Sequence, residues 1–164
     1  MDLNSELRFD ADPAAVFAML TDEAYIEKKT MAANAIRHQA SVRRDGDRVT
    51  IDLLRVMPPD VPDFVRRFVG ETIDIKQRDT WGPAAADGSR DGSIELEMSG
   101  APVRATGTMR LAGNGASTVL TIKALLKASV PLVGGKIEQA VHQGLMHAVK
   151  VEERVGNDWL AGTR

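Results

Sequence analysis

The sequence predicts an α+β fold in which a bent antiparallel sheet of about seven strands wraps around one long C-terminal helix. Segments with alternating apolar and polar residues follow one another between short polar turns, which is typical of antiparallel strands. The final segment, 137–159, instead has apolar residues at every third or fourth position, the period of a helix. The sheet has one apolar face, and only this helix is long enough to cover it.

The chain begins with a strand and two short helices. Residues 2–9 alternate as a half-buried strand does. Asp12 is a suitable N-cap and Pro13 a suitable first helical residue, so a short helix is expected to start there. Either Thr21 or Asp22 is expected to cap a second short helix.

Six further segments show the two-residue alternation of strands. They cover 35–44, 49–53, 72–81, 94–98, 103–111 and 120–127. The Asp45-Gly46 pair and the segment 113–115 are tight-turn sequences. The polar, glycine-rich stretch 82–92 is expected to form a hairpin loop.

The stretch 57–70 interrupts this series. Its three prolines exclude a central strand, and its apolar spacing allows a short helical turn. Two interpretations stay open. The stretch is a crossing between halves of the sheet, or it is a mobile flap whose Phe64 and Phe68 close the mouth of a cavity.

Composition limits the classes of function. A chain of 164 residues fits one domain, 1–164, and its 43% apolar and 27% charged residues are typical of a soluble globular protein. The net charge of −2 gives no basic field for nucleic acid. There is no cysteine, which excludes disulfides, thiol catalysis and thiolate metal sites.

The sequence shows no targeting or membrane segment. Residues 1–10 lack the basic and apolar regions of a signal peptide, and no apolar run approaches the roughly 20 residues that span a bilayer. We therefore expect a cytoplasmic protein that neither inserts into membranes nor binds nucleic acid. A homodimer stays open.

Two glycines and a lysine, Gly134-Gly135-Lys136, precede the final helix and raise the question of a phosphate site. A P-loop needs G-x-x-x-x-G-K-[ST] after a parallel strand, but Val130 replaces its first glycine and Ile137 its hydroxyl residue. The glycines are better explained by a sharp turn that brings the helix start close to the sheet.

A mid-helix glycine, Gly144, also suggests close packing, because glycine there costs about 1 kcal/mol relative to alanine. We expect backbone to approach the sheet or a ligand at this position, with Gly107 as the facing residue.

Motifs for metal and hydrolase chemistry are absent. His142 and His147 are five residues apart and so fall on different helix faces, and His38 stands alone on a strand. Neither H-E-x-x-H nor G-x-S-x-G occurs. We expect no metal and no cofactor.

Five polar residues occupy the apolar phase of their elements: His38, Arg55, Gln77 and Asp79 on strands, and Glu152 near the helix stripe. Polar groups that face an interior must be paired or hydrated. They lie at sheet ends near solvent, or they are the few convergent polar groups of an otherwise apolar pocket.

Four stretches carry a family resemblance: FDADPAAVFAMLTDEAYIEKK, ETIDIKQRDTW, SGAPVRATGTMRL and VPLVGGKIEQ. Nearly the whole chain resembles the helix-grip proteins of the START superfamily, also called SRPBCC, which includes the birch-pollen allergen and polyketide cyclase-like families. Within it, the chain is similar to a bacterial family of uncharacterised proteins. The resemblance implies a deep apolar cavity between sheet and C-terminal helix, used for lipids, sterols or polyketides. The catalytic residues of the cyclases have no matching motif, and the iron–sulfur ligands of the ring-hydroxylating relatives are absent.

Two groups of residues are expected to form the ligand site. The apolar side chains expected to line the cavity are Leu53, Trp81, Met98, Met109, Leu120, Ile122, Ile137, Val141 and Leu145. His38, Gln77 and Asp79 are expected to orient the polar end of the ligand.

Three functional hypotheses follow. The first, which we favour, is a non-enzymatic carrier or sensor of a hydrophobic small molecule. The second is a cyclase or dehydratase-type enzyme that uses the same pocket, with His38 or Asp79 as general base. The third is a protein-interaction module, which predicts a filled interior and a contiguous exposed apolar patch.

Overall fold

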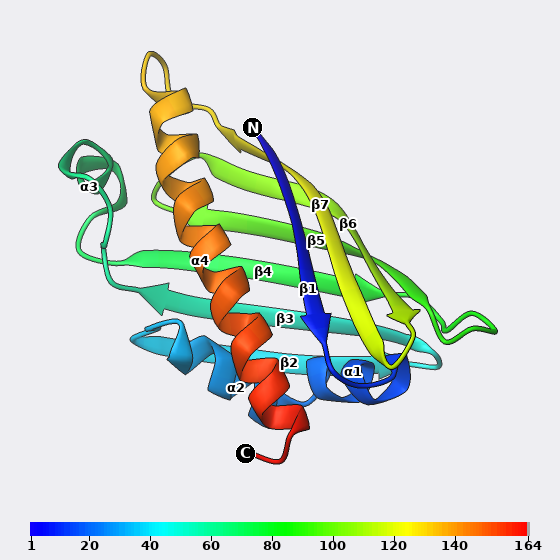
Figure 1. Cartoon of the computed structure of the whole chain (residues 1–164). Coiled ribbons are helices and arrows are strands. Elements are labelled where there is room, and N and C mark those ends of the chain that lie inside the picture. Colours follow the sequence, from blue (N-terminus) through cyan, green and yellow to red (C-terminus); the bar gives the residue numbers. More distant parts are fainter. Residues whose placement is uncertain (164) are drawn as a thin grey trace.

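The computed structural model describes residues 1–163 and confirms the predicted α+β fold. A seven-stranded antiparallel sheet curves around a long C-terminal helix, which crosses one of its faces diagonally (Figure 1). In chain order the elements are β1 (Asp2–Phe9), α1 (Pro13–Leu20), α2 (Glu23–Ala32), β2 (Arg37–Asp45), β3 (Arg48–Met57), α3 (Asp63–Val69), β4 (Ile73–Trp81), β5 (Arg90–Ser99), β6 (Val103–Asn114), β7 (Ser117–Ala128) and α4 (Gly134–Leu160).

The strands are ordered β1-β7-β6-β5-β4-β3-β2. All neighbours from β2 to β7 are consecutive in the chain, whereas β1 pairs with β7, with Leu7 opposite Leu120. The two edge strands, β1 and β2, are therefore consecutive in sequence, and α1 and α2 connect them. Figure 1 shows these short helices at the end of the sheet where α4 ends.

Both predicted helix starts are confirmed. The Asp12 carboxylate accepts a hydrogen bond from the Ala15 backbone N–H at 2.9 Å, with Pro13 as the first helical residue. Asp22 caps α2 by accepting from the Ala24 N–H at 2.8 Å. Thr21, the alternative cap, instead ends α1, and its hydroxyl donates to the Phe17 carbonyl at 2.9 Å.

Some strands are longer than the sequence pattern predicts. β3 continues to Met57, past the predicted 49–53, and β5 begins at Arg90, inside the stretch predicted as loop. In both cases ladder hydrogen bonds extend the strand through residues that break the alternation, Leu54 to Met57 in β3 and Arg90 to Ser93 in β5. The tight turns are confirmed, with positive φ at Gly46 and Gly115.

The interior holds two separate apolar clusters. The first lies around α1, α2 and the end of α4, where the Phe17 and Trp81 rings pack edge to face with centroids 5.9 Å apart. The second lies around α3 and the start of α4 and includes Val65 and Ile137. Among the described residues, no helix is long and apolar enough to cross a membrane.

The glycines before α4 have the predicted packing role only in part. A Cβ on Gly134 would lie 2.6 Å from the Ala128 carbonyl oxygen, so α4 starts against the end of β7, whereas Gly135 faces open space. The expected pairing of Gly144 with Gly107 is wrong. Gly107 packs against the backbone of β7 at its partner Ala124, and nothing lies within 4 Å of a Cβ built on Gly144.

Candidate functional site

A cavity of about 200 Å³ lies between α3, α4 and the inner face of the sheet. Apolar side chains from three directions form most of its wall. They are Val65, Phe68 and Val69 from α3, Ile73, Ile75, Met98 and Val103 from the sheet, and Ile137, Val141, Leu145 and Ala148 from α4. The cavity therefore belongs to the second apolar cluster and to the start and middle of α4.

Gly144 explains part of the empty space. It lies on the same helical face as Val141 and Ala148, three residues after one and four before the other, and all three line the cavity. Gly144 is itself exposed, so it lies where the cavity opens to solvent. Glycine leaves the space open, since a Cβ would meet no atom within 4 Å.

The proline-rich stretch 57–70 forms the outer wall. Its helix, α3, connects β3 to β4, and Phe68 lines the cavity. Phe64 packs against the second cluster but is not part of the lining. Because β3 and β4 are neighbouring antiparallel strands, the stretch is not a crossing between halves of the sheet. It forms a wall of the cavity, and its movement as a flap stays a prediction.

The predicted apolar site residues divide between the two clusters. Met98, Ile137, Val141 and Leu145 line the cavity. The other five, Leu53, Trp81, Met109, Leu120 and Ile122, all face the interior but pack in the first cluster, which α1 and α2 fill. Their role in ligand binding stays a prediction. The cavity itself is lined by residues of the second cluster.

A chain of hydrogen bonds joins three interior polar side chains of β3 and β4. Arg55 Nη2 donates to Gln77 Oε1 at 3.1 Å, and Gln77 Nε2 donates to the Asp79 carboxylate at 3.0 Å. Gln77 lies at the centre of β4 and not at a sheet end. Arg55 lines the cavity, whereas Gln77 and Asp79 lie behind it, toward the first cluster.

A salt bridge between the helices completes this polar layer. Lys29 of α2 contacts Glu152 of α4 with 2.7 Å between Nζ and Oε1. The Tyr25 hydroxyl donates to the Glu152 backbone carbonyl at 3.2 Å, and burial raises the pKa of this phenol. The layer separates the two apolar clusters, because on β4 it falls between Ile75 of the second and Trp81 of the first.

Burial perturbs the ionisation of the interior groups. It raises the pKa of Asp79 to about 6, against the opposing influence of Lys29 and of the Gln77 hydrogen bond. Burial also lowers the pKa of Arg55, while the nearby charges of Glu152 and Asp79 act to raise it. These opposite shifts have one cause, the cost of holding a charge away from water.

The histidines do not form a metal site. His38 faces the interior opposite Arg55 on the neighbouring strand and is half-buried, without lining the cavity. His147 is exposed and lines the cavity at α4, and His142 is half-buried. Within residues 1–163, no three His, Cys, Asp or Glu side chains cluster in a way that could hold a metal ion.

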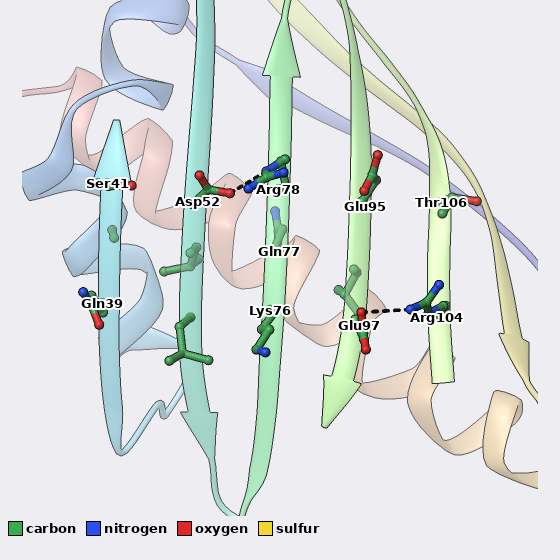
Figure 2. Close-up of a pocket in the computed structure, with 14 residues that line it drawn as sticks. Gln39, Ser41, Asp52, Lys76, Gln77, Arg78, Glu95, Glu97, Arg104 and Thr106 are labelled. Atoms are coloured by element: carbon green, nitrogen blue, oxygen red, sulfur yellow. Dashed lines mark hydrogen bonds and ion pairs between the residues drawn. The ribbon is translucent and has the colours of Figure 1, made fainter. Parts of the chain in front are cut away.

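The outer face of the sheet has a different character (Figure 2). Charged side chains from β2 to β6 pair across strands, with 2.6 Å between Arg78 Nε and Asp52 Oδ1 and 3.2 Å between Arg104 Nη2 and Glu97 Oε2. An open groove of about 490 Å³ runs between them. These pairs are exposed to solvent, so they contribute little to stability. Substitutions of these surface charges can therefore serve as controls for substitutions of the interior charges.

Solved structures share the fold over almost the whole chain. A protein from Thermus thermophilus has a TM-score of 0.64 at 15% identity, with 100% of both chains covered. A START superfamily protein from Mycobacterium smegmatis has a TM-score of 0.59 at 14% identity, covering 94% of this chain and 96% of the other. A STAR-related lipid transfer protein from Xanthomonas axonopodis has a TM-score of 0.55 at 17% identity, covering 92% and 84%. The resemblance to the START helix-grip proteins is confirmed at the level of fold.

The chain also has relatives in sequence. An uncharacterized protein of Mycobacterium tuberculosis is 25% identical over 118 residues, which is 71% of this chain and 67% of the relative. A second, from Mycobacterium bovis, matches to the same extent. The family described as "Protein of unknown function (DUF2505)" matches residues 4–160, nearly the whole chain, and the protein therefore belongs to the DUF2505 family.

Proposed function

We propose that this protein binds a hydrophobic small molecule in the cavity between α3, α4 and the sheet, as a carrier or sensor. The observation that carries the proposal is the mostly apolar cavity between α3, α4 and the sheet, which Gly144 leaves open. Apolar walls with few polar groups are typical of small-molecule sites. The START and lipid-transfer proteins of the same fold add a general expectation of apolar ligands.

The energetics favour an occupant. Side chains around an empty cavity lose dispersion contacts that a ligand restores. An apolar ligand gains about 25 cal/mol for each Å² removed from water, before ordering costs. The cavity of about 200 Å³ lies below the roughly 300–1,000 Å³ typical of such sites, so a small or slender ligand fits best.

The enzyme hypothesis has weaker support. Asp79 faces the interior with a pKa raised to about 6, which suits a general base. A general base must also reach the reacting atom, and neither Asp79 nor His38 lines the cavity. The interaction-module hypothesis expected a filled interior, and the cavity argues against it.

Filling the open space of the cavity should weaken ligand binding. Gly144→Leu places a side chain in the open space, and we expect it to weaken binding of the neutral dye Nile red by about tenfold or more. Gly135→Leu is the matched control, because it makes the same change in α4 at an open position outside the cavity. Dye fluorescence, together with native mass spectrometry of the freshly purified protein, measures both. Equal binding by the two variants would contradict the proposed site.

A further inference from the structure

Arg55 is an incompletely paired cation in the cavity wall. A guanidinium has five N–H donors. Within residues 1–163, the only hydrogen bond of this side chain is the 3.1 Å contact from Nη2 to Gln77 Oε1, and its Nε is shielded from solvent without any acceptor. Buried charges in proteins are normally paired, so this guanidinium has unused capacity for an acceptor.

No carboxylate of the described chain fills that role. Glu152 is already paired with Lys29 at 2.7 Å, and Asp79 bonds to the far side of the Gln77 amide. Neither lies within salt-bridge distance of Arg55 among the described residues. Gln77 uses its carbonyl oxygen on Arg55 and its amide nitrogen on Asp79, so it separates the two charges.

The position of Arg55 indicates where an acceptor for its free N–H groups could lie. Arg55 lines the cavity together with Met57, Ile75 and Val141, which are apolar. A molecule in the cavity therefore meets mostly apolar wall, with Arg55 at the polar layer and Asn34, Asp60 and His147 as the other polar lining residues. Guanidinium groups bind carboxylates in bidentate geometry, which supplies two oxygens to neighbouring N–H donors.

We infer that the ligand is an amphiphile with a carboxylate head, which binds Arg55 while its apolar chain occupies the cavity. The inference rests on the proposed function and adds the head group to it. A single negative head balances the charges of the layer when Asp79 is protonated. The layer holds two cations, Lys29 and Arg55, against Glu152 and Asp79, and Asp79 is the acid that can take up a proton when a further anion arrives.

Head-group discrimination by the wild-type protein tests the inference. Decanoic acid, decanol and methyl decanoate share one chain and differ at the head, and each is titrated against bound Nile red near pH 7, where the acid is ionised. We expect decanoate to bind about tenfold or more tightly than the alcohol and the ester. Equal affinities would overturn the inference and leave the proposed function intact. Failure of the dye and all three compounds to bind would overturn both.

Two interior variants and one surface variant assign the effect to Arg55. Arg55→Met is expected to remove the preference for decanoate while decanol binding is kept. Asp79→Asn removes a competing negative charge and is expected to strengthen decanoate binding severalfold without affecting decanol. Arg104→Met, on the outer face, is the matched control and should retain the full preference. A preference that persists in Arg55→Met would overturn the assignment. If Arg55→Met does not fold, the opposite change in Asp79→Asn still tests it.

Discussion

Asp79→Asn is expected to stabilise the protein at neutral pH by about 2 kcal/mol while leaving its stability near pH 4 almost unchanged. Burial raises the pKa of Asp79 from 3.8 to about 6. A shift of this size corresponds to about 3 kcal/mol against the ionised form, and partial contact with water reduces the effect. Asparagine keeps an oxygen that accepts the Gln77 hydrogen bond, so the variant removes the charge and little else.

The sign follows from the direction of the shift. The folded protein binds the Asp79 proton more tightly than the unfolded chain does, so ionisation of Asp79 opposes folding. Below about pH 4 the group is neutral in both states and has no effect. Between about pH 4 and pH 6 the cost develops, and above pH 6 it is complete. The difference in unfolding free energy between variant and wild type, from urea denaturation across this range, should therefore increase with pH.

Asp52→Asn gives the opposite pattern and serves as the matched control. Asp52 lies on the outer face, where the hydrogen bond and charge of Arg78 hold its pKa below the usual range. Its contribution is present above the ordinary pKa and is lost as pH falls, so the variant should be slightly less stable at neutral pH only. A difference between Asp79→Asn and wild type that is constant with pH would contradict the burial of an ionised Asp79.

The sheet could be predicted because alternation is a local signal. Successive residues of β1 are exposed and buried in turn, in step with the alternation of polar and apolar residues in the sequence. The consecutive hairpins follow from the short turns. Pattern alone does not pair β1 with β7, since that contact joins residues far apart in the chain, such as Leu7 and Leu120. The bent sheet around the final helix was predicted from its one apolar face and the long apolar stripe of that helix, and the family resemblance agreed with it.

The cavity could be predicted only in part. Alternation shows which side chains face inward. It does not show whether helices pack against those side chains or leave a cavity next to them. Leu53 and Trp81 have the same inward phase as Ile75, yet α1 and α2 cover the first two and leave Ile75 at the cavity. Useful signals were present in the proline-flanked α3, which carries Phe68, and in a glycine on the apolar stripe of α4.

The polar layer shows the same limit. His38, Arg55, Gln77 and Asp79 have an inward phase that is visible in the sequence, and this predicts a set of interior polar groups. Their partners depend on side-chain geometry across strands, which one sequence does not show. Arg55, which is not among the predicted ligand-binding residues, is the one of the four that lines the cavity.

Two glycines of α4, the buried Gly156 and the exposed Gly144, should respond to alanine in opposite ways. Gly156→Ala is expected to destabilise the protein by about 2 kcal/mol, because a Cβ there would overlap the Phe9 ring and lie 3.0 Å from the Tyr25 hydroxyl. Both aromatic side chains are fully buried, at 0% exposure, so neither can move aside freely. Gly144→Ala is expected to stabilise the helix by about 1 kcal/mol, because alanine is the better helix former and the space is open.

Urea denaturation of the two variants separates helix propensity from packing. Propensity alone predicts that both gain stability, since both glycines lie inside α4. A loss at Gly156 with a gain at Gly144 requires that α4 packs tightly against β1 and α2 side chains near its C-terminal end and faces open space at its middle. The open space at Gly144 is part of the cavity. Stabilisation by both substitutions would mean that α4 can shift at its C-terminal end, and the first cluster would then be loosely packed too.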